Sequence, residues 1–224
     1  MIYRQYLKRF FAIILSALAI LVLSWLLMIL AIIIKCTSKG PVFFKQKRVG
    51  KDKIHFNILK FRTMRTDTPK DVPTHLLTNP EQYITPIGRF LRKTSLDELP
   101  QLFNIFVGDM AIVGPRPALW NQEDLIAERD LYHANAVRPG LTGLAQVSGR
   151  DELPILVKAR YDGDYVDNIT LLVDAMLILR TAGSVLRHEG VKEGKAEEES
   201  KQDGMNMSSD GAVEEYASTR DNSD

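Results

Sequence analysis

The longest apolar run of the chain lies near its start and carries no charge for 25 residues, from Phe10 to Ile34. A helix needs about 20 consecutive apolar residues to cross the hydrocarbon core of a bilayer. The run is too long for the apolar core of a signal peptide, and no small-residue cleavage site follows it. The pattern therefore predicts a retained membrane helix over residues 1–36.

The flanks of this run bear on its topology, and they point in two directions. Basic residues lie on both sides of the run: Arg4, Lys8, Arg9, Lys35 and Lys39. Positive residues favour the cytoplasmic side, so two basic flanks favour a re-entrant helix that returns to the side it entered. No proline or glycine lies inside the run to bend it, which favours a spanning helix. The residues alone leave both topologies open.

Two segments rich in β-formers follow, GPVFFKQKRVG and KIHFNILKFRTM, with the turn Gly50-Lys51-Asp52 between them. This order predicts a β-hairpin. Alternate residues of a strand point to the same face, so Lys45 and Lys47 share one face and Lys60 and Arg62 share another. Such basic pairs either face an anionic ligand or belong to a solvated edge strand.

Helical periodicity recurs in the second half of the chain. In residues 85–95, Ile87, Phe90 and Leu91 share one helical face, which either lies on the membrane surface or packs in a core. Further helices are expected over residues 120–134, 154–168 and 169–186. Loops are expected over residues 65–83, which contain three prolines, and over the glycine-rich residues 138–150.

Charge separates the C-terminal end from the rest. Residues 191–224 hold ten acidic and four basic residues, so residues 1–190 keep 25 basic and 18 acidic residues and a net charge of +7. The acidic segment, poor in large apolar residues, is predicted to be a disordered tail. A basic body beside an apolar anchor indicates an anionic partner such as lipid headgroups or phosphates. Nucleic acid is not expected, because no binding motif for it is visible.

Other chemistry is excluded by composition. One cysteine rules out an internal disulfide and fits a reducing compartment, and the four histidines show no metal-ligand spacing. No nucleotide-binding P-loop or dinucleotide fingerprint is present.

Two adjacent carboxylates, Asp97 and Glu98, stand where a helix is expected to begin, because Pro100 fits only a first turn. Ser95 and Glu98 match the S-x-x-E capping box, so a purely structural role is one interpretation. The other is chemical, since an ionised carboxylate can attack phosphorus. Paired carboxylates also suit Mg²⁺, which substrate phosphates help to hold.

Arginines near this pair favour the chemical interpretation. Arg92 precedes Asp97 by five residues, and Arg116 is held between Pro115 and Pro117. The planar guanidinium binds two phosphate oxygens at once. Carboxylates, arginines and a membrane anchor together suggest phosphoryl transfer to or from a lipid, although they do not identify the donor.

Four ordered motifs then resemble the bacterial sugar transferase family, the small monotopic phosphoglycosyl transferases. They are SKGPVFFKQKRVG, FNILKFRTM, GRFLRKTSLDELPQLFNIFVGDMAIVGPRP and VRPGLTGLAQVSGR. The resemblance runs from the anchor to about Glu189 and excludes the acidic tail. It implies an α/β fold with a re-entrant N-terminal helix, amphipathic surface helices and a small sheet. Residues 37–190 would form the catalytic domain on the cytoplasmic face of the bacterial inner membrane.

The resemblance also implies a reaction. Such enzymes move a sugar-1-phosphate from a UDP-sugar to undecaprenyl (polyprenyl) phosphate and release UMP, which is the first membrane step of exopolysaccharide, capsule, lipopolysaccharide or glycoprotein glycan synthesis. They require Mg²⁺. By this analogy Asp97 attacks the β-phosphate and carries the phosphosugar, while Glu98 helps to bind the metal and to remove a proton. Arg92 and Arg116 fall on phosphate-binding positions, and Arg138 and Arg150 would lie near the nucleotide or lipid phosphate.

One departure from the family concerns the anchor, which in relatives breaks near a Ser-Pro pair. Here Trp25 follows Ser24, so the bend lacks the effect of a proline, worth about 3 kcal/mol in an ordinary helix. Re-entry remains the expectation, supported by Ser24 and the two basic flanks.

Two other functions fit part of the pattern. A membrane-anchored phosphohydrolase would use the same aspartate with water in place of the lipid phosphate. A non-enzymatic assembly protein would use Ser95 and Glu98 only as a helix cap, and Asp97→Asn would then leave its function intact. The sequence indicates neither the sugar nor the oligomeric state.

Overall fold

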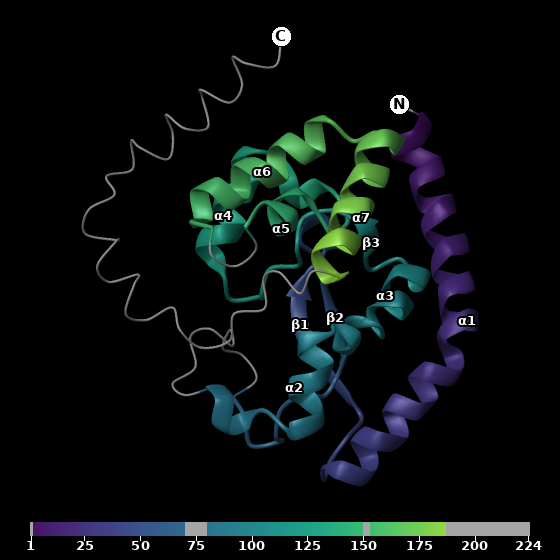
Figure 1. Ribbon diagram of the computed structural model, residues 1–224. Helices are drawn as coiled ribbons and strands as arrows, with labels where there is room; N and C mark the ends of the chain where they lie inside the picture. The colour runs from purple at the N-terminus through teal and green to yellow at the C-terminus, as the bar shows by residue number, and fades with distance from the viewer. Residues whose placement is uncertain (1, 70–79, 150–152, 187–224) are drawn as a thin grey trace.

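The computed structural model describes residues 2–69, 80–149 and 153–186, and Figure 1 shows a helix-rich body with a long N-terminal helix along one side. The acidic tail of residues 191–224, Arg150 and half of the proline-containing loop lie outside the described residues. The predictions for them therefore stay predictions.

Helices and two small sheets make up the body, as the α/β prediction requires. The helices are α1 (Lys8–Thr37), α2 (Pro86–Lys93), α3 (Gln101–Val107), α4 (Glu123–Leu131), α5 (Leu144–Ser148), α6 (Ile155–Asp167) and α7 (Leu171–Leu186). The strands are β1 (Phe43–Val49), β2 (His55–Phe61), β3 (Ala111–Val113) and β4 (Gly140–Thr142). Strands β1 and β2 are antiparallel, with Phe43 opposite Phe61, whereas β3 and β4 are parallel.

The predicted hairpin is confirmed as β1 and β2, and its basic residues have separate surroundings. Lys47 lies over the ring of Trp120, 5.2 Å from its centroid. Arg62 is buried just beyond β2 and donates hydrogen bonds to the carbonyls of Ser38 and Lys39, where α1 ends. Arg62 therefore fastens the anchor to the hairpin, and Lys60 alone of its pair turns to the candidate site described below.

The prediction of a loop over residues 138–150 is wrong, because this segment contains β4 and α5. Its glycines permit a backbone contact that no other residue allows. A Cβ on Gly140 would lie 2.1 Å from the nitrogen of Gly114, and one on Gly143 would lie 2.1 Å from the Gly114 carbonyl oxygen. Glycine thus serves close packing of two chain segments here, which composition alone does not distinguish from a loop.

Helix α1 is the one helix of the described residues that is long and apolar enough to cross a membrane, counted from Tyr3 with the preceding π-helical turn. Side chains along its middle are more than half exposed: Leu18, Leu21, Val22, Trp25 and Met28. The predicted membrane anchor therefore has the exposed apolar surface that a bilayer would cover. Membrane anchoring follows as the plausible role of this helix.

Both ends of α1 pack against the same body. Near its start, Ala12 lies in a core cluster with Ile58, Ile105 and Met110. Near its end, Leu30 and Ile34 lie in a second cluster with Phe61 and Leu91. Figure 1 shows that the helix axis changes direction in its second half, which brings the two ends to the body.

Ser24 does not interrupt α1, which is continuous from Lys8 to Thr37. The Ser24 hydroxyl donates a hydrogen bond to the carbonyl of Leu21 at 2.8 Å. Serine bonds of this kind bend helices only slightly, so Ser24 does not break the helix.

Helix α2 begins at Thr85, whose hydroxyl accepts a hydrogen bond from the Gly88 amide. Ile87 and Leu91 pack against the last turns of α1, while Phe90 stays 52% exposed. The predicted apolar face is therefore divided between a core contact with the anchor and an exposed ring.

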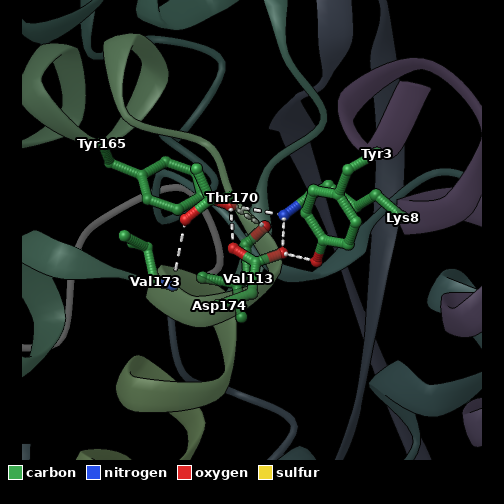
Figure 2. A network of polar contacts seen from close by, with 7 residues as sticks. All are labelled: Tyr3, Lys8, Val113, Tyr165, Thr170, Val173 and Asp174. Carbon is green, nitrogen blue, oxygen red and sulfur yellow. Dashed lines mark hydrogen bonds and ion pairs between the residues drawn. The ribbon is translucent and has the colours of Figure 1, made fainter. Parts of the chain in front are cut away.

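A polar network fixes the N-terminal start of the anchor to α6 and α7 (Figure 2). The buried carboxylate of Asp174, on α7, accepts hydrogen bonds from the Tyr3 hydroxyl at 2.6 Å and from the Lys8 ammonium at 2.5 Å. The Tyr165 hydroxyl lies 2.7 Å from Asp174 and also accepts from Lys8. Burial, followed by the charge of Asp174, raises the pKa of Tyr165, so this phenol stays neutral.

Candidate active site

The carboxylate pair sits in a short 3-10 turn, Leu96–Glu98, that leads into α3. Ser95 adopts a left-handed conformation with φ 56° and makes no side-chain cap bond. Glu98 instead turns to Lys60, so the capping box is not formed. The interpretation of this motif as a capping box is therefore wrong. Pro100 sits at the N-cap of α3, in line with its predicted place at a helix start.

Asp97 is buried, with 9% of its surface exposed. Burial raises the pKa of this carboxyl from 3.8 to about 6, with the charge of Glu98 adding to the rise. Lys60 is the strongest influence in the other direction, followed by Arg92 and Arg116. No described residue donates a hydrogen bond to the Asp97 carboxylate. Near neutral pH it is thus mostly an anion to which the described residues donate no hydrogen bond, a state that favours reaction or ligand binding.

Glu98 is bound to the cations around it. Its Oε1 lies 2.7 Å from Lys60 Nζ and 3.6 Å from Arg116 Nη2. Lys60 comes from β2 and Arg116 from the loop after β3, so the turn, the hairpin and this loop converge on one point.

Arg92 lies on the last turn of α2 and is directed by the segment after β2. Its Nε donates to the Thr63 hydroxyl at 3.0 Å, and its Nη2 lies 3.3 Å from the sulfur of Met64. Gly88 makes this approach possible, because a Cβ there would lie 2.0 Å from the Thr63 carbonyl oxygen. The guanidinium is close enough to lower the pKa of Asp97.

Not all of the predicted site residues come together. Asp97, Glu98, Arg92 and Arg116 form one group, whereas Arg138 lies at the other end of α3. Arg138 Nε donates to the carbonyl of Gly108 at 2.8 Å, and its charge acts on Arg9 of the anchor. The predicted place of Arg138 near the reacting phosphates has no support in these contacts, and Arg150 lies outside the described residues.

Sequence reasoning missed Lys60 as a member of this group. The hairpin pattern placed Lys60 on the same strand face as Arg62. This shared face was the only sequence feature that pointed to a role in binding an anion. Its partner Glu98 lies 38 residues away in sequence, and α3 had to be packed on β2 before the pair could be recognised.

The arrangement suits an anionic ligand and a divalent cation. Three cationic side chains lie near two carboxylates, and a phosphate bound there would meet positive charge beside a buried carboxylate. Among the described residues, no group of three His, Cys, Asp or Glu side chains is placed to hold a metal ion. A metal at Asp97 and Glu98 would therefore need ligands from the substrate, as Mg²⁺ commonly has.

Comparison with known proteins shows to which family the chain belongs. The family model for bacterial sugar transferases matches residues 3–188. The chain belongs to the bacterial sugar transferase family. The resemblance carried by the four sequence motifs is thereby confirmed, and in this sugar transferase Arg92 and Arg116 lie beside the carboxylate pair.

Relatives of this sugar transferase are named for exopolysaccharide production or for transfer of a sugar phosphate to undecaprenyl phosphate. Exopolysaccharide production protein ExoY of Sinorhizobium fredii is 34% identical over 82% of this chain and 87% of its own length. The undecaprenyl-phosphate galactose phosphotransferase of Salmonella typhimurium is 37% identical, over 83% of this chain and 42% of its own. The UDP-glucose:undecaprenyl-phosphate glucose-1-phosphate transferase of Klebsiella pneumoniae is 41% identical, over 78% of this chain and 39% of its own. The chain therefore spans nearly all of ExoY but about two-fifths of the two longer enzymes.

Proposed function

We propose that this sugar transferase moves a sugar-1-phosphate from a UDP-sugar to undecaprenyl phosphate through a covalent intermediate on Asp97. The observation that carries the proposal is the state of Asp97, which is buried, mostly ionised near neutral pH and without a hydrogen-bond donor among the described residues. A carboxylate placed only for stability would be expected to be paired.

The proposed reaction has two displacements at phosphorus. An Asp97 oxygen attacks the β-phosphorus of the UDP-sugar, and the bond from this phosphorus to the oxygen that links it to the α-phosphate breaks. UMP leaves with that electron pair, and the sugar phosphate remains on Asp97 as an acyl phosphate. A phosphate oxygen of undecaprenyl phosphate then attacks the same phosphorus. The Asp97 carboxylate is released and undecaprenyl diphosphate sugar forms.

The surrounding cations fit the charge changes of this scheme. Arg92 and Arg116 would bind the phosphate oxygens of the donor, and Lys60 beside Glu98 would add positive charge near the reacting phosphorus. Their charges also lower the pKa of Asp97 against the effect of burial, which keeps the nucleophile available as the anion. Arg138 lies at the other end of α3, and its expected role near the nucleotide or lipid phosphate stays a prediction.

Mg²⁺ belongs to the proposal as the expected cofactor. Asp97 and Glu98 would hold it together with the substrate phosphates, and the hard oxygen ligands of the pair fit this ion. When bound, the ion would neutralise charge on the phosphates during transfer. The residues of the chain would do the rest, with Asp97 as nucleophile and Glu98 as the acceptor of the proton from the lipid phosphate.

A re-entrant anchor is the topology we propose for α1. Its support is that Ala12 at one end and Leu30 and Ile34 at the other pack against the same body. A helix that crossed the bilayer would have to separate its ends by about 30 Å of hydrocarbon. With basic residues before and after the apolar run, both ends and the body would lie on the cytoplasmic face of the inner membrane.

The experiment is a donor and acceptor test on detergent-purified protein with Mg²⁺. UDP-glucose, UDP-galactose and UDP-N-acetylglucosamine are each supplied with and without undecaprenyl phosphate, and UMP release is measured. We expect release that requires the lipid and that stops on addition of EDTA. Release without lipid would identify a phosphohydrolase instead, and transfer by Asp97→Asn at the wild-type rate would refute the covalent mechanism.

A further inference from the structure

The loop that carries Arg116 is fastened at four consecutive backbone carbonyls. The acceptors and their donors are Pro115 with the Gly140 amide at 2.8 Å, Arg116 with Arg129 Nη1 at 3.0 Å, Pro117 with Arg48 Nη1 at 2.9 Å, and Ala118 with the Val49 amide at 2.9 Å. The donors come from β4, α4 and β1. The two prolines also restrict the φ angle on either side of Arg116. The backbone of this residue is therefore fixed by three separate elements.

The donor at the centre of this arrangement, Arg129, is itself held rigidly. Its side chain is 4% exposed and that of its partner Asp162 is 1% exposed. Arg129 Nε and Nη2 both donate to Asp162 Oδ2, at 2.8 and 2.5 Å. Two bonds to one carboxylate fix the plane of the guanidinium, and the third nitrogen then points at the carbonyl of Arg116.

Stability alone is a weak reason for this pair. Burying two charges is costly, and apolar residues of similar volume often serve a fold as well or better. The pair instead joins α4 and α6 to a backbone atom of the residue whose side chain reaches Glu98. A charged ligand-binding group works best when neighbouring residues lock its position.

We infer that Arg129 and Asp162 are positioning residues for Arg116. They hold its backbone so that its guanidinium stays beside the carboxylate pair, ready for the donor phosphates. This inference rests on the proposed function, because the role of Arg116 does.

The main test replaces the ion pair by apolar residues of similar size, in the double variant Arg129→Met/Asp162→Leu. This change removes the donor to the Arg116 carbonyl without leaving an unpaired buried charge. We expect kcat/KM for the donor to fall about tenfold, the low end of the loss that removal of an outer supporting partner causes at other sites. The melting temperature should change little.

A double-mutant cycle separates positioning from a general loss of stability. In the background of Arg116→Ala, the same double change should lower kcat/KM less than about twofold, because residues that act through one another are not additive. Equal losses in both backgrounds would overturn the inference. Leu177→Ala, a fully buried residue of α7 whose core cluster contains none of residues 115–118, is the control and should give equal losses in both.

A second variant and a second readout keep the test independent of folding and of activity. Arg129→Lys keeps a charge against Asp162 but has one nitrogen in place of three, so it should show the same non-additivity with Arg116→Ala. Hydrogen exchange of the Gly140 and Val49 amides, which bond the loop, should quicken in both Arg129 variants and not in Leu177→Ala. Unchanged exchange would overturn the inference. If wild type transfers no sugar phosphate, the proposed function fails, and hydrogen exchange alone decides on positioning.

Discussion

Two buried aspartates in this sugar transferase have opposite surroundings. Asp174 accepts hydrogen bonds from Tyr3, Lys8 and Tyr165 and fixes the start of the anchor to α7. Asp97 is as deeply buried but has only charges nearby and no hydrogen bond from the described residues. A satisfied buried carboxylate holds a structure together, whereas an unsatisfied one stores free energy that a reaction can use. The comparison thus assigns Asp174 a structural role and supports the chemical role that we propose for Asp97.

The largest expected effect breaks the chemistry and spares the fold. Asp97→Asn should lower kcat at least about a thousandfold, because an amide cannot act as the nucleophile in the covalent step. Turnover is measured as lipid-dependent UMP release. Asp174→Asn serves as the matched control, since it makes the same change at a buried site outside the carboxylate pair. At a temperature where this control is folded, it should keep activity within about tenfold of wild type. Equal losses of turnover in the two variants would show that Asp97 has no chemical role that Asp174 lacks.

The next effect concerns stability, for which Asp174 is expected to matter more than Asp97. Asp174→Asn should lower the free energy of unfolding by about 3 kcal/mol, because Lys8 is then left buried without its counter-charge. Urea unfolding of the detergent-solubilised protein measures this loss. The double variant Lys8→Met/Asp174→Leu should recover most of it, since no unpaired charge remains. A double variant as unstable as Asp174→Asn would show that the ion pair is not what matters.

At Asp97 the same change to asparagine should raise the free energy of unfolding, the opposite of its effect at Asp174. The native pKa is raised from 3.8 to about 6, so the folded protein binds a proton more tightly than the unfolded chain does. Ionisation therefore destabilises the fold as the pH rises from about 4 to about 6. Asp97→Asn removes this penalty and should stabilise the protein at pH 8 by up to about 3 kcal/mol, since each pKa unit is worth about 1.4 kcal/mol.

The same variant provides its own control through pH. Below about pH 3 the carboxyl is protonated in both the folded and the unfolded state, so the gain from Asp97→Asn should disappear. Unfolding midpoints at about pH 3 and about pH 8 test this. A gain that is equal at both pH values would mean that the amide improves packing and that the carboxylate is not under strain.

How far these residues could be predicted from sequence depends on the distance between partners. The hairpin and the apolar anchor come from patterns within a few residues, and both are present. Asp97 and Glu98 were singled out because they are adjacent. Lys8 and Asp174 are 166 residues apart, and no local pattern indicated that they meet.

The errors have the same physical origin. The glycines of residues 138–150 predict a loop, because glycine is common in turns. In the structure Gly140 and Gly143 instead pack against the backbone of Gly114. Ser95 and Glu98 match the sequence pattern of a capping box, but Glu98 forms an ion pair with Lys60 and the cap is absent. Tertiary contacts decided each of these points, and a single sequence does not contain them in readable form.

The smallest effect concerns the pH dependence of activity. The acid limb of kcat/KM reports ionisation of the free enzyme, so activity should fall as the pH drops through an apparent pKa near 6, where Asp97 becomes protonated. Lys60 opposes the effect of burial on this pKa. Lys60→Met should therefore move the acid limb to higher pH, while Lys45→Met, an exposed lysine on the same hairpin, should leave it in place. A limb that stays fixed in Lys60→Met would mean that the ionisation limiting activity belongs to a group other than Asp97.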